Sequence, residues 1–205
     1  MNILITGATG YLGGCLSLHL KKDFNFNITT CSSSDNGDFG HKHLKIDWGN
    51  NESIKQVCDD KDIIIHCASP NAKESELNPE GTYKFNSIIL DRFIKQAIIS
   101  NVKKFIYFSS AHIYNSPLLG HLKESTPLKP THPYGISKKI AEETLLKYSK
   151  LKSFTINIIR LSNVFGIPCN KKINPWSLVV NDFCYQAFKT KRIKIKAESN
   201  EIRNF

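Results

Sequence analysis

The stretch that decides the fold reads Asn2-Ile3-Leu4-Ile5-Thr6-Gly7-Ala8-Thr9-Gly10-Tyr11-Leu12-Gly13-Gly14. Its apolar start predicts a strand, and the amphipathic pattern after the glycines predicts a helix to about residue 22. Strand, glycine turn and helix is the context of a dinucleotide-binding turn. Gly7 permits the bend, Gly10 lets the backbone approach a pyrophosphate, and Gly13 lets the helix pack on the strand. The spacing is Gly-x-x-Gly-x-x-Gly and not Gly-x-Gly-x-x-Gly, yet its place directly after a strand favours phosphate binding.

Five more stretches have the pattern of short strands, and helical patterns lie at about 51–59, 79–100 and 132–149. The apolar character of 62–69 is typical of a strand that is buried on both faces of a parallel sheet. The alternation predicts an α/β fold, a doubly wound parallel sheet in the order 3-2-1-4-5-6 with helices on both faces. Ligands of such sheets bind at the carboxyl ends of the strands. The predicted strands are Phe26–Cys31, Leu44–Asp47, Asp62–Ser69, Lys104–Ser110 and Ser153–Arg160.

The charge of the chain is uneven. Residues 1–102 hold 10 Lys/Arg against 12 Asp/Glu, and residues 103–205 hold 18 against 6, so the second half carries the net charge of +10. No helix-turn-helix, RNA-binding sheet signature or zinc-finger spacing accompanies it. We therefore expect no nucleic-acid partner, and a small molecule that bears phosphate. The densest basic run, 189–196, ends in Lys/Ile alternation, which predicts a strand with one solvated face.

The composition is that of a globular protein with one sizeable core, since 40% of the 205 residues are hydrophobic and 22% are charged. The six cysteines form no Cys-x-x-Cys pair, so we expect reduced, structural thiols and no metal site. The chain has no basic leader and no apolar stretch approaching about 18 residues, which argues against a signal peptide or a membrane span. We expect a cytoplasmic location without a membrane partner.

Tyr134 and Lys138 stand four residues apart in a predicted helix, so their side chains share one face. A lysine beside a tyrosine favours the phenolate, which lets a phenol with an ordinary pKa of about 10 exchange protons nearer neutral pH. The pair is therefore a candidate general acid/base. Tyr-x-x-x-Lys also occurs by chance on solvated helix faces. Here a glycine turn, a Ser109-Ser110 strand end and a strand exit at Asn163 accompany it.

The end of the second predicted strand bears on the choice of cofactor. Many NAD-binding folds place an acid there, on the ribose 2′-hydroxyl. This chain has Cys31-Ser32-Ser33-Ser34 instead, and its first acid is Asp35. The repulsion that excludes a 2′-phosphate is missing and three hydroxyls are available to bind one, so NADP is favoured over NAD. No Arg stands nearby to hold the phosphate.

Seven blocks of the sequence, in order, resemble the extended short-chain dehydrogenases/reductases, in particular the nucleotide-sugar epimerases, reductases and dehydratases typified by UDP-glucose 4-epimerase. The resemblance covers the whole chain. It implies a Rossmann-like NAD(P)-binding domain over residues 1–165 and the start of a substrate-binding region over residues 166–205. The blocks are Gly7/Gly10/Gly13, Asp47, His66-Cys67-Ala68, Asn86, Ser109 to Tyr114, Pro133 to Lys138 and Arg160 to Gly166.

The resemblance implies that NAD or NADP lies against the glycine turn and the strand ends. Asp47 would hold the adenine amino group, Ala68 would line the cleft, and Asn86 would steady the helix that faces it. The implied cofactor-binding residues are Gly7, Gly10, Tyr11, Leu12, Gly13, Ser32, Asp47, Trp48, Cys67, Ala68, Ser69, Asn86, Tyr134 and Lys138.

The resemblance also implies the catalytic roles. Tyr134 would exchange a proton with a sugar hydroxyl or keto oxygen while hydride moves between that carbon and the nicotinamide. Lys138 would support the phenolate and bind the nicotinamide ribose, and Ser110 would orient the sugar oxygen and stabilise developing charge. Asn163 would lie near the diphosphate of a nucleotide sugar. The alternative for Ser110 is a hydrogen bond to its local backbone.

Departures from the family pattern narrow the reaction. Ala111-His112 follows Ser110 where sugar 4,6-dehydratases carry an Asp-Glu pair, so a dehydratase is disfavoured. An epimerase and a 4-keto-reductase both need only Ser110, Tyr134 and Lys138, and the serines after the second strand favour the reductase. The chain ends at residues 201–205, where the family has about a further third, so we expect a truncated enzyme. The alternative function is a cofactor-binding fragment or regulatory module with little turnover.

In the resembled family, helices equivalent to 79–100 and 132–149 form a bundle between subunits. Ile88, Phe93, Ile140 and Leu145 would supply outward-facing apolar groups, so we expect a homodimer. The alternative is that these side chains pack on their own sheet.

Overall fold

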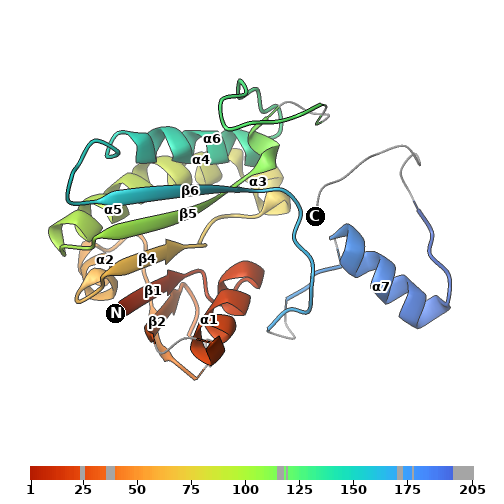
Figure 1. Ribbon diagram of the computed structural model, residues 1–205, viewed down its shortest axis with the longest axis horizontal. Coiled ribbons are helices and arrows are strands. Elements are labelled where there is room, and N and C mark those ends of the chain that lie inside the picture. Colours follow the sequence, from red (N-terminus) through yellow and green to blue (C-terminus); the bar gives the residue numbers. More distant parts are fainter. Residues whose placement is uncertain are drawn as a thin grey trace.

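The computed structural model describes residues 1–23, 26–35, 40–114, 118, 120–169, 173–176 and 178–195. Within these residues six strands form one parallel sheet in the order β3-β2-β1-β4-β5-β6, which confirms the predicted topology (Figure 1). All strands run the same way, so their carboxyl ends lie along one edge. The strands are β1 (Asn2–Thr6), β2 (Asn27–Ser32), β3 (Lys42–Lys45), β4 (Ile63–His66), β5 (Lys104–Ser110) and β6 (Thr155–Leu161).

Helices connect the strands, and side-chain caps mark where several of them begin. At α3, for example, Asn71 and Glu74 form a reciprocal capping box. The predicted helix at 79–100 is interrupted by a π-helical turn, and α3 and α7 were not predicted. None of the described helices is both long and apolar enough to cross a membrane. The helical elements are α1 (Tyr11–Asp23), α2 (Asn51–Cys58), α3 (Ala72–Leu77), α4 (Pro79–Lys84), the π-helical turn Phe85–Ile89, α5 (Leu90–Ile99), the 3-10 turn Ala111–Ile113, α6 (Pro133–Leu146) and α7 (Val179–Thr190).

Alternation along the strands divides the apolar side chains between two faces of the sheet. Leu4, Ile64 and Phe105 lie on one face and pack with residues of α2, α5 and α6. Ile5 and Ile65 lie on the opposite face and pack against α1. All five side chains are buried, and burial of each contributes about 1.5–3 kcal/mol. The face under α2, α5 and α6 is called the covered face below.

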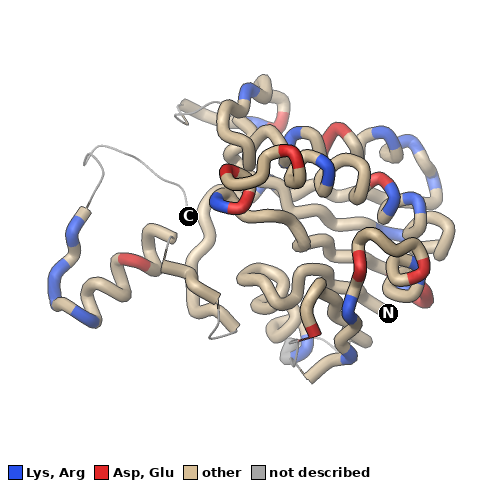
Figure 2. The backbone as a smooth tube through the Cα atoms, turned by 180° about the vertical axis from the view of Figure 1, so that it is seen from behind, with Lys and Arg blue, Asp and Glu red and all other residues tan. Residues whose placement is uncertain are grey.

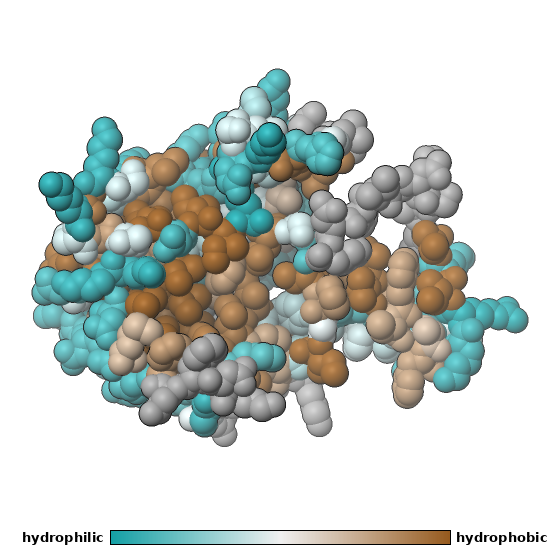
Figure 3. Space-filling model, viewed as in Figure 1, coloured by the Kyte–Doolittle hydropathy of each residue, from teal (hydrophilic) through white to brown (hydrophobic). Residues whose placement is uncertain are grey.

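The second face is covered only in part. Among the described helices α1 packs there, on β1 and β2. Further along the same face Ile106 and Phe108 of β5 are half-buried, and Ile159 of β6 is 40% exposed. Figure 3 looks onto these strands and shows apolar residues gathered over them. We call the surface formed by Ile106, Phe108 and Ile159 the open face.

Two of the four residues predicted to face outward toward a second subunit do not. Phe93 and Leu145 are fully buried and pack in the core of the covered face. They lie on the sheet-facing stripes of α5 and α6, which correspond to the alternative that the sequence left open. Ile88 is 57% exposed and Ile140 is half-buried. The homodimer stays a prediction.

The basic run at 189–196 is not the predicted strand. Its first two residues complete α7, Lys191 has a left-handed backbone with φ of +57°, and residues 192–195 have no regular structure. The backbone N–H of Lys194 donates to the Gln186 side chain at 2.7 Å, so this segment bonds to α7 and not to a neighbouring strand. Figure 2 shows basic residues at the end of α7 and along the chain that follows. Residues 196 and 201–205 lie outside the described residues.

Candidate functional site

The predicted site residues lie where the six strands end. Because the strands are parallel and their registers match, these ends form one edge of the sheet. β3 and β4 stop earlier than predicted, at Lys45 and His66, so Asp47 and Ser69 lie in the turns that follow. Taken along the chain from β1 to β6, the residues at this edge are Gly7, Gly10, Tyr11, Leu12 and Gly13 after β1, Ser32 at the end of β2, Asp47 and Trp48 after β3, Cys67, Ala68 and Ser69 after β4, Ser110 at the end of β5, and Asn163 after β6.

The glycine turn is built by close backbone approaches. Gly7 has a φ of +66°, and a Cβ at this residue would lie 2.7 Å from the backbone nitrogen of Ala68. A Cβ at Gly13 would lie 2.6 Å from the carbonyl oxygen of Gly7, which also accepts the Gly10 N–H at 2.9 Å. The turn leads into the first residues of α1, whose N–H groups have no intrahelical acceptor. A cradle without side chains at a helix N-terminus fits a pyrophosphate.

Thr6 connects the ends of β1 and β4, a role that the sequence argument missed. Its hydroxyl oxygen accepts the Ala68 N–H at 3.2 Å and lies 3.0 Å from Nδ1 of His66. Burial, together with the charge of Lys138, lowers the pKa of His66 to about 3, so this imidazole is neutral. The position of Thr6, the last strand residue before Gly7, was the available signal.

Asn86 lies on the π-helical turn and is fully buried. Its Nδ2 donates to the Ser137 hydroxyl at 3.0 Å and to the Ser69 hydroxyl at 3.3 Å. Ser137 in turn donates to the carbonyl oxygen of Tyr134 at 2.8 Å. Asn86 therefore links the segment after β4 to the first turn of α6, and the steadying role that the resemblance implied stays a prediction.

The structure brings the three predicted catalytic side chains together. The Ser110 hydroxyl hydrogen-bonds the phenol of Tyr134 and also accepts the His112 N–H at 3.2 Å, so it makes the local backbone bond as well. Lys138 is 5% exposed, and its Nζ lies 5.6 Å from the centre of the Tyr134 ring. The same Nζ donates to the carbonyl oxygen of Phe108 at 3.0 Å. The group can position a hydroxyl or keto oxygen for proton exchange.

The expected fall in the pKa of Tyr134 is not observed. Burial raises this pKa, and the hydrogen bond from Ser110 opposes the rise only in part. Burial also lowers the pKa of Lys138 to about 8. The predicted fall rested on the charge of Lys138, whereas desolvation, which both groups share, raises the pKa of the phenol.

Several predicted residues use their side chains inside the protein. The Ser32 hydroxyl, in a residue 4% exposed, donates to the carbonyl oxygen of Ser34 at 2.8 Å. The Asp47 carboxylate accepts the Gly49 N–H at 2.8 Å, although Asp47 itself is exposed. The Trp48 ring packs edge-on against core aromatic rings. Burial raises the pKa of Cys67 to about 12, and Asn163 is half-buried.

His132 is a second residue that the sequence argument missed. Its Nδ1 accepts the Tyr134 N–H at 3.1 Å and so caps α6, while its Nε2 lies 2.8 Å from a carboxylate oxygen of Glu76 in α3. The signal was its place directly before Pro133 at the helix start. The first turn of α6, which carries Tyr134, is thereby held to α3.

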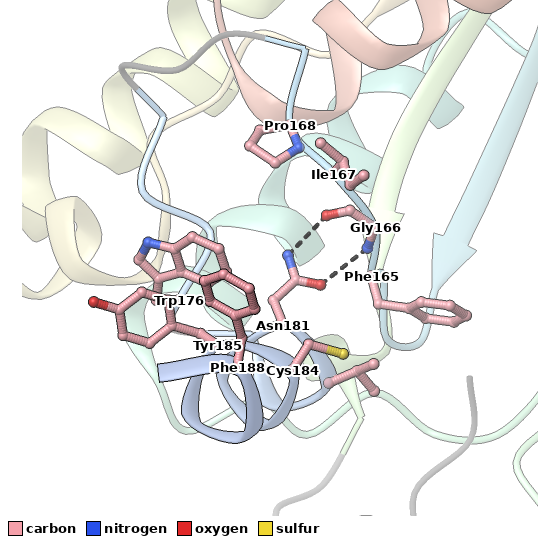
Figure 4. Close-up of a pocket in the computed structure, with 10 residues that line it drawn as sticks. Phe165, Gly166, Ile167, Pro168, Trp176, Asn181, Cys184, Tyr185 and Phe188 are labelled. Carbon is pink, nitrogen blue, oxygen red and sulfur yellow. Dashed lines mark hydrogen bonds between the residues drawn. The ribbon is translucent and has the colours of Figure 1, made fainter. Parts of the chain in front are cut away.

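A separate cavity of about 300 Å³ lies between α7 and the chain that leaves β6 (Figure 4). The Asn181 side chain accepts the Gly166 N–H and donates to the Gly166 carbonyl, both at 2.9 Å. None of the predicted catalytic or cofactor residues lines it. No group of three or more His, Cys, Asp or Glu in the described ranges is arranged to hold a metal ion. The cavity is lined by Phe165, Gly166, Ile167, Pro168, Trp176, Val180, Asn181, Cys184, Tyr185 and Phe188.

Comparison with known proteins shows the family of this chain. The family model described as the NAD dependent epimerase/dehydratase family matches residues 3–205. The chain belongs to this family. The match confirms the family resemblance found in the sequence.

Individual relatives of this family member are distant in sequence. A probable UDP-arabinose 4-epimerase 3 of Arabidopsis thaliana is 28% identical over 183 residues, which cover 80% of this chain and 44% of that protein. A putative UDP-glucose 4-epimerase of Methanocaldococcus jannaschii is 25% identical over 211 residues, 99% of this chain and 68% of that protein. The chain thus spans less than half the length of the first of these relatives.

Solved structures show the same fold. The UDP-glucose 4-epimerase of Thermotoga maritima, solved with UDP-glucose, superposes with a TM-score of 0.83 at 21% identity, covering 99% of this chain and 68% of that chain. The UDP-Glc/GlcNAc 4-epimerase of Campylobacter jejuni gives a TM-score of 0.71 at 28% identity, covering 79% and 53%. The Rossmann-like α/β fold of this family member is therefore that of known epimerases.

Proposed function

We propose that this chain supplies the cofactor cleft and the acid/base residues of a NAD-dependent nucleotide-sugar 4-epimerase. The observation that carries the proposal is the half-buried phenol of Tyr134, bonded to Ser110 and flanked by Lys138, on the same sheet edge as the glycine turn. The relatives named as UDP-arabinose and UDP-glucose 4-epimerases support the reaction and the substrate class.

Bound NAD would accept and return the hydride. Tyr134 takes the proton of the sugar hydroxyl and later gives it back, while Ser110 orients that oxygen. At neutral pH Lys138 keeps its proton, since its pKa is lowered only to about 8, so its positive charge is available to the phenolate when that forms. Asn86 and His132 position Tyr134 by holding the first turn of α6.

The choice between NAD and NADP decides between an epimerase and a 4-keto-reductase. The serines at 32–34 favoured NADP and the reductase, and Ser33 is exposed. Against this, the Ser32 hydroxyl bonds to the carbonyl of Ser34, which leaves fewer groups for a 2′-phosphate. We therefore place NAD first and keep NADP with the reductase as the second candidate.

The remaining sequence predictions form part of the proposal. Residues 1–165 serve as the cofactor domain and 166–205 begin the substrate region, with Asn163 near the diphosphate. The protein acts in the cytoplasm as a homodimer, for which the exposed Ile88 remains available. The alternative is a cofactor-binding module with little turnover.

A ligand-binding and turnover experiment tests the proposal. We expect NAD to raise the melting temperature more than NADP, because a ligand that binds only the native state at a hundredfold excess over Kd stabilises it by about 2.7 kcal/mol. Incubation with UDP-sugars should then yield the 4-epimer, detected by NMR. Tyr134→Phe should keep the melting shift and lose turnover. A shift without turnover in the wild type supports the module, and a larger shift with NADPH supports the reductase.

A further inference from the structure

Two cysteines from distant parts of the chain lie side by side. Cys15 belongs to the second turn of α1, and Cys169 follows β6. The Cys169 thiol hydrogen-bonds the Cys15 thiol, and the Cys15 thiol donates to the carbonyl oxygen of Ile167 at 3.6 Å. Both residues are half-buried and both are free thiols.

Gly14 provides the space for this contact. A side chain at Gly14 would collide with the sulfur of Cys169, which lies directly against the bare helix backbone. Glycine inside a helix is less favourable than alanine. A Cβ at Gly14 would also lie 2.9 Å from the carbonyl oxygen of Ala8, so Gly14 provides space both for the Cys169 sulfur and for the turn that precedes α1.

The contact belongs to a larger attachment between α1 and the chain that leaves β6. Tyr11 and Cys15 stand four residues apart on α1 and share one face. The Tyr11 hydroxyl donates to the carbonyl oxygen of Gly166 at 2.8 Å, and Gly166 is held from its other side by Asn181 of α7. Whatever fixes residues 166–169 to α1 therefore also restrains α7.

We propose that Cys15 and Cys169 are a redox-modification site, at which a reversible disulfide fastens residues 166–169, and through Gly166 and Asn181 also α7, to α1. The oxidant is a small-molecule disulfide. The Cys15 thiolate attacks it, forming a mixed disulfide and releasing one thiol; the Cys169 thiolate then attacks the Cys15 sulfur, forming the intramolecular bond and releasing the second thiol. The two cysteine protons go to the two released thiols.

The other cysteines supply a contrast. Cys31 and Cys58 are fully buried, so an oxidant of this size cannot reach them. Burial raises the pKa of Cys169 to about 11, which assigns it the second step, after Cys15 has been activated as a mixed disulfide. Cys184, exposed on α7, is the matched control because it is an accessible free thiol.

The test uses the whole chain treated with oxidised glutathione and digested under non-reducing conditions. We expect a peptide pair joining Cys15 to Cys169 that separates on reduction, and a melting temperature about 5–10 °C above that of the reduced protein. Cys169→Ser should lose both effects, and Cys184→Ser should keep both. Separate glutathione adducts on the two cysteines, free thiols at both, or the same thermal rise in Cys169→Ser would each overturn the proposal. The peptide map of the wild type decides the matter without any variant.

Discussion

The covered face and the open face of the sheet are made by the same strands, yet their side chains differ in how far they are buried. Ile158 and Ile159 are neighbours in β6; Ile158 packs against the core under α5 and α6, and Ile159 is 40% exposed on the open face. The site residues Asn86, Tyr134 and Lys138 all lie on helical elements of the covered face. The strand sequence sets which side chains share a face, and the packed helices decide which face carries stability and chemistry.

Matched truncations on the two faces should show the largest difference. Phe93 is fully buried and its ring lies 5.3 Å from those of Trp48 and His66. Phe93→Ala should reduce the free energy of unfolding by about 4 kcal/mol, because it removes the ring and leaves a cavity. Ile159→Ala, the control on the open face, should cost less than about 1 kcal/mol. Urea denaturation measures both, and equal losses would contradict the distinction between the faces.

A buried ion pair on the covered face gives the next largest effect. Arg160 of β6 donates to both carboxylate oxygens of Glu142, at 3.0 and 2.7 Å, and the Glu142 side chain is only 3% exposed. Arg160→Met should destabilise the protein by about 3 kcal/mol, since it leaves that carboxylate buried without its partner. Asn157→Ala, on the opposite side of the same strand, should change stability by less than about 0.5 kcal/mol. If chemical denaturation gives Arg160→Met the same free energy of unfolding as the wild type, this prediction is wrong.

Acid should lower the free energy of unfolding through His66, which is buried on the covered face. Its folded pKa is lowered to about 3, so below the unfolded value of 6.5 the unfolded chain binds more protons. The free energy of unfolding should therefore decrease as the pH is lowered, by about 2 kcal/mol from pH 6.5 to about pH 4.5. Denaturation at a series of pH values should show this slope flattened in His66→Gln and kept in His19→Gln, which alters an exposed histidine. Parallel slopes in the two variants would exclude His66 as the cause.

The smallest effect concerns the cap that starts α6 on the covered face. His132→Ala removes the acceptor for the Tyr134 N–H and should cost about 1 kcal/mol. His132→Asn keeps an acceptor at that position and should recover most of the loss, although it gives up the contact with Glu76. Thermal denaturation of the two variants side by side measures the difference. If asparagine recovers nothing, the contact with Glu76 is the stabilising interaction and the cap is not.

The sheet topology was predictable because strand periodicity, glycine turn chemistry and alternation with helices all indicate the same fold. Sequence spacing also placed Tyr134 beside Lys138, since helical geometry brings residues four apart together. The predicted direction of the Tyr134 pKa shift was wrong, because burial depends on the packed protein and cannot be inferred from residue spacing. The outward facing of Phe93 and Leu145 was wrong for a related reason: an apolar stripe does not say which neighbour covers it.

Other features depended on contacts that no local pattern encodes. The Lys/Ile alternation after residue 190 imitates a strand, but the Gln186 side chain bonds to the Lys194 backbone instead. Thr6 and His132 also form hydrogen bonds with Ala68 and Glu76, which lie 62 and 56 residues away along the chain, and spacing rules do not reach so far. The site roles themselves follow from family resemblance, and the geometry supplies the reason for proposing them.

The π-helical turn at Phe85–Ile89 bears on how genes for such proteins can change in length. A π turn holds one residue more than an α-helical turn in the same path. Deletion of one codon within it would leave Leu90 and Phe93 facing the sheet, because the helices on either side already have the register of an uninterrupted helix. Asn86 would lose its hydrogen bonds to Ser137 and Ser69, and the edge-on contact of Phe85 with Trp48 would change as well. A one-residue deletion at this place would therefore alter contacts at the carboxyl edge of the sheet and keep the packing of Leu90 and Phe93 in the core.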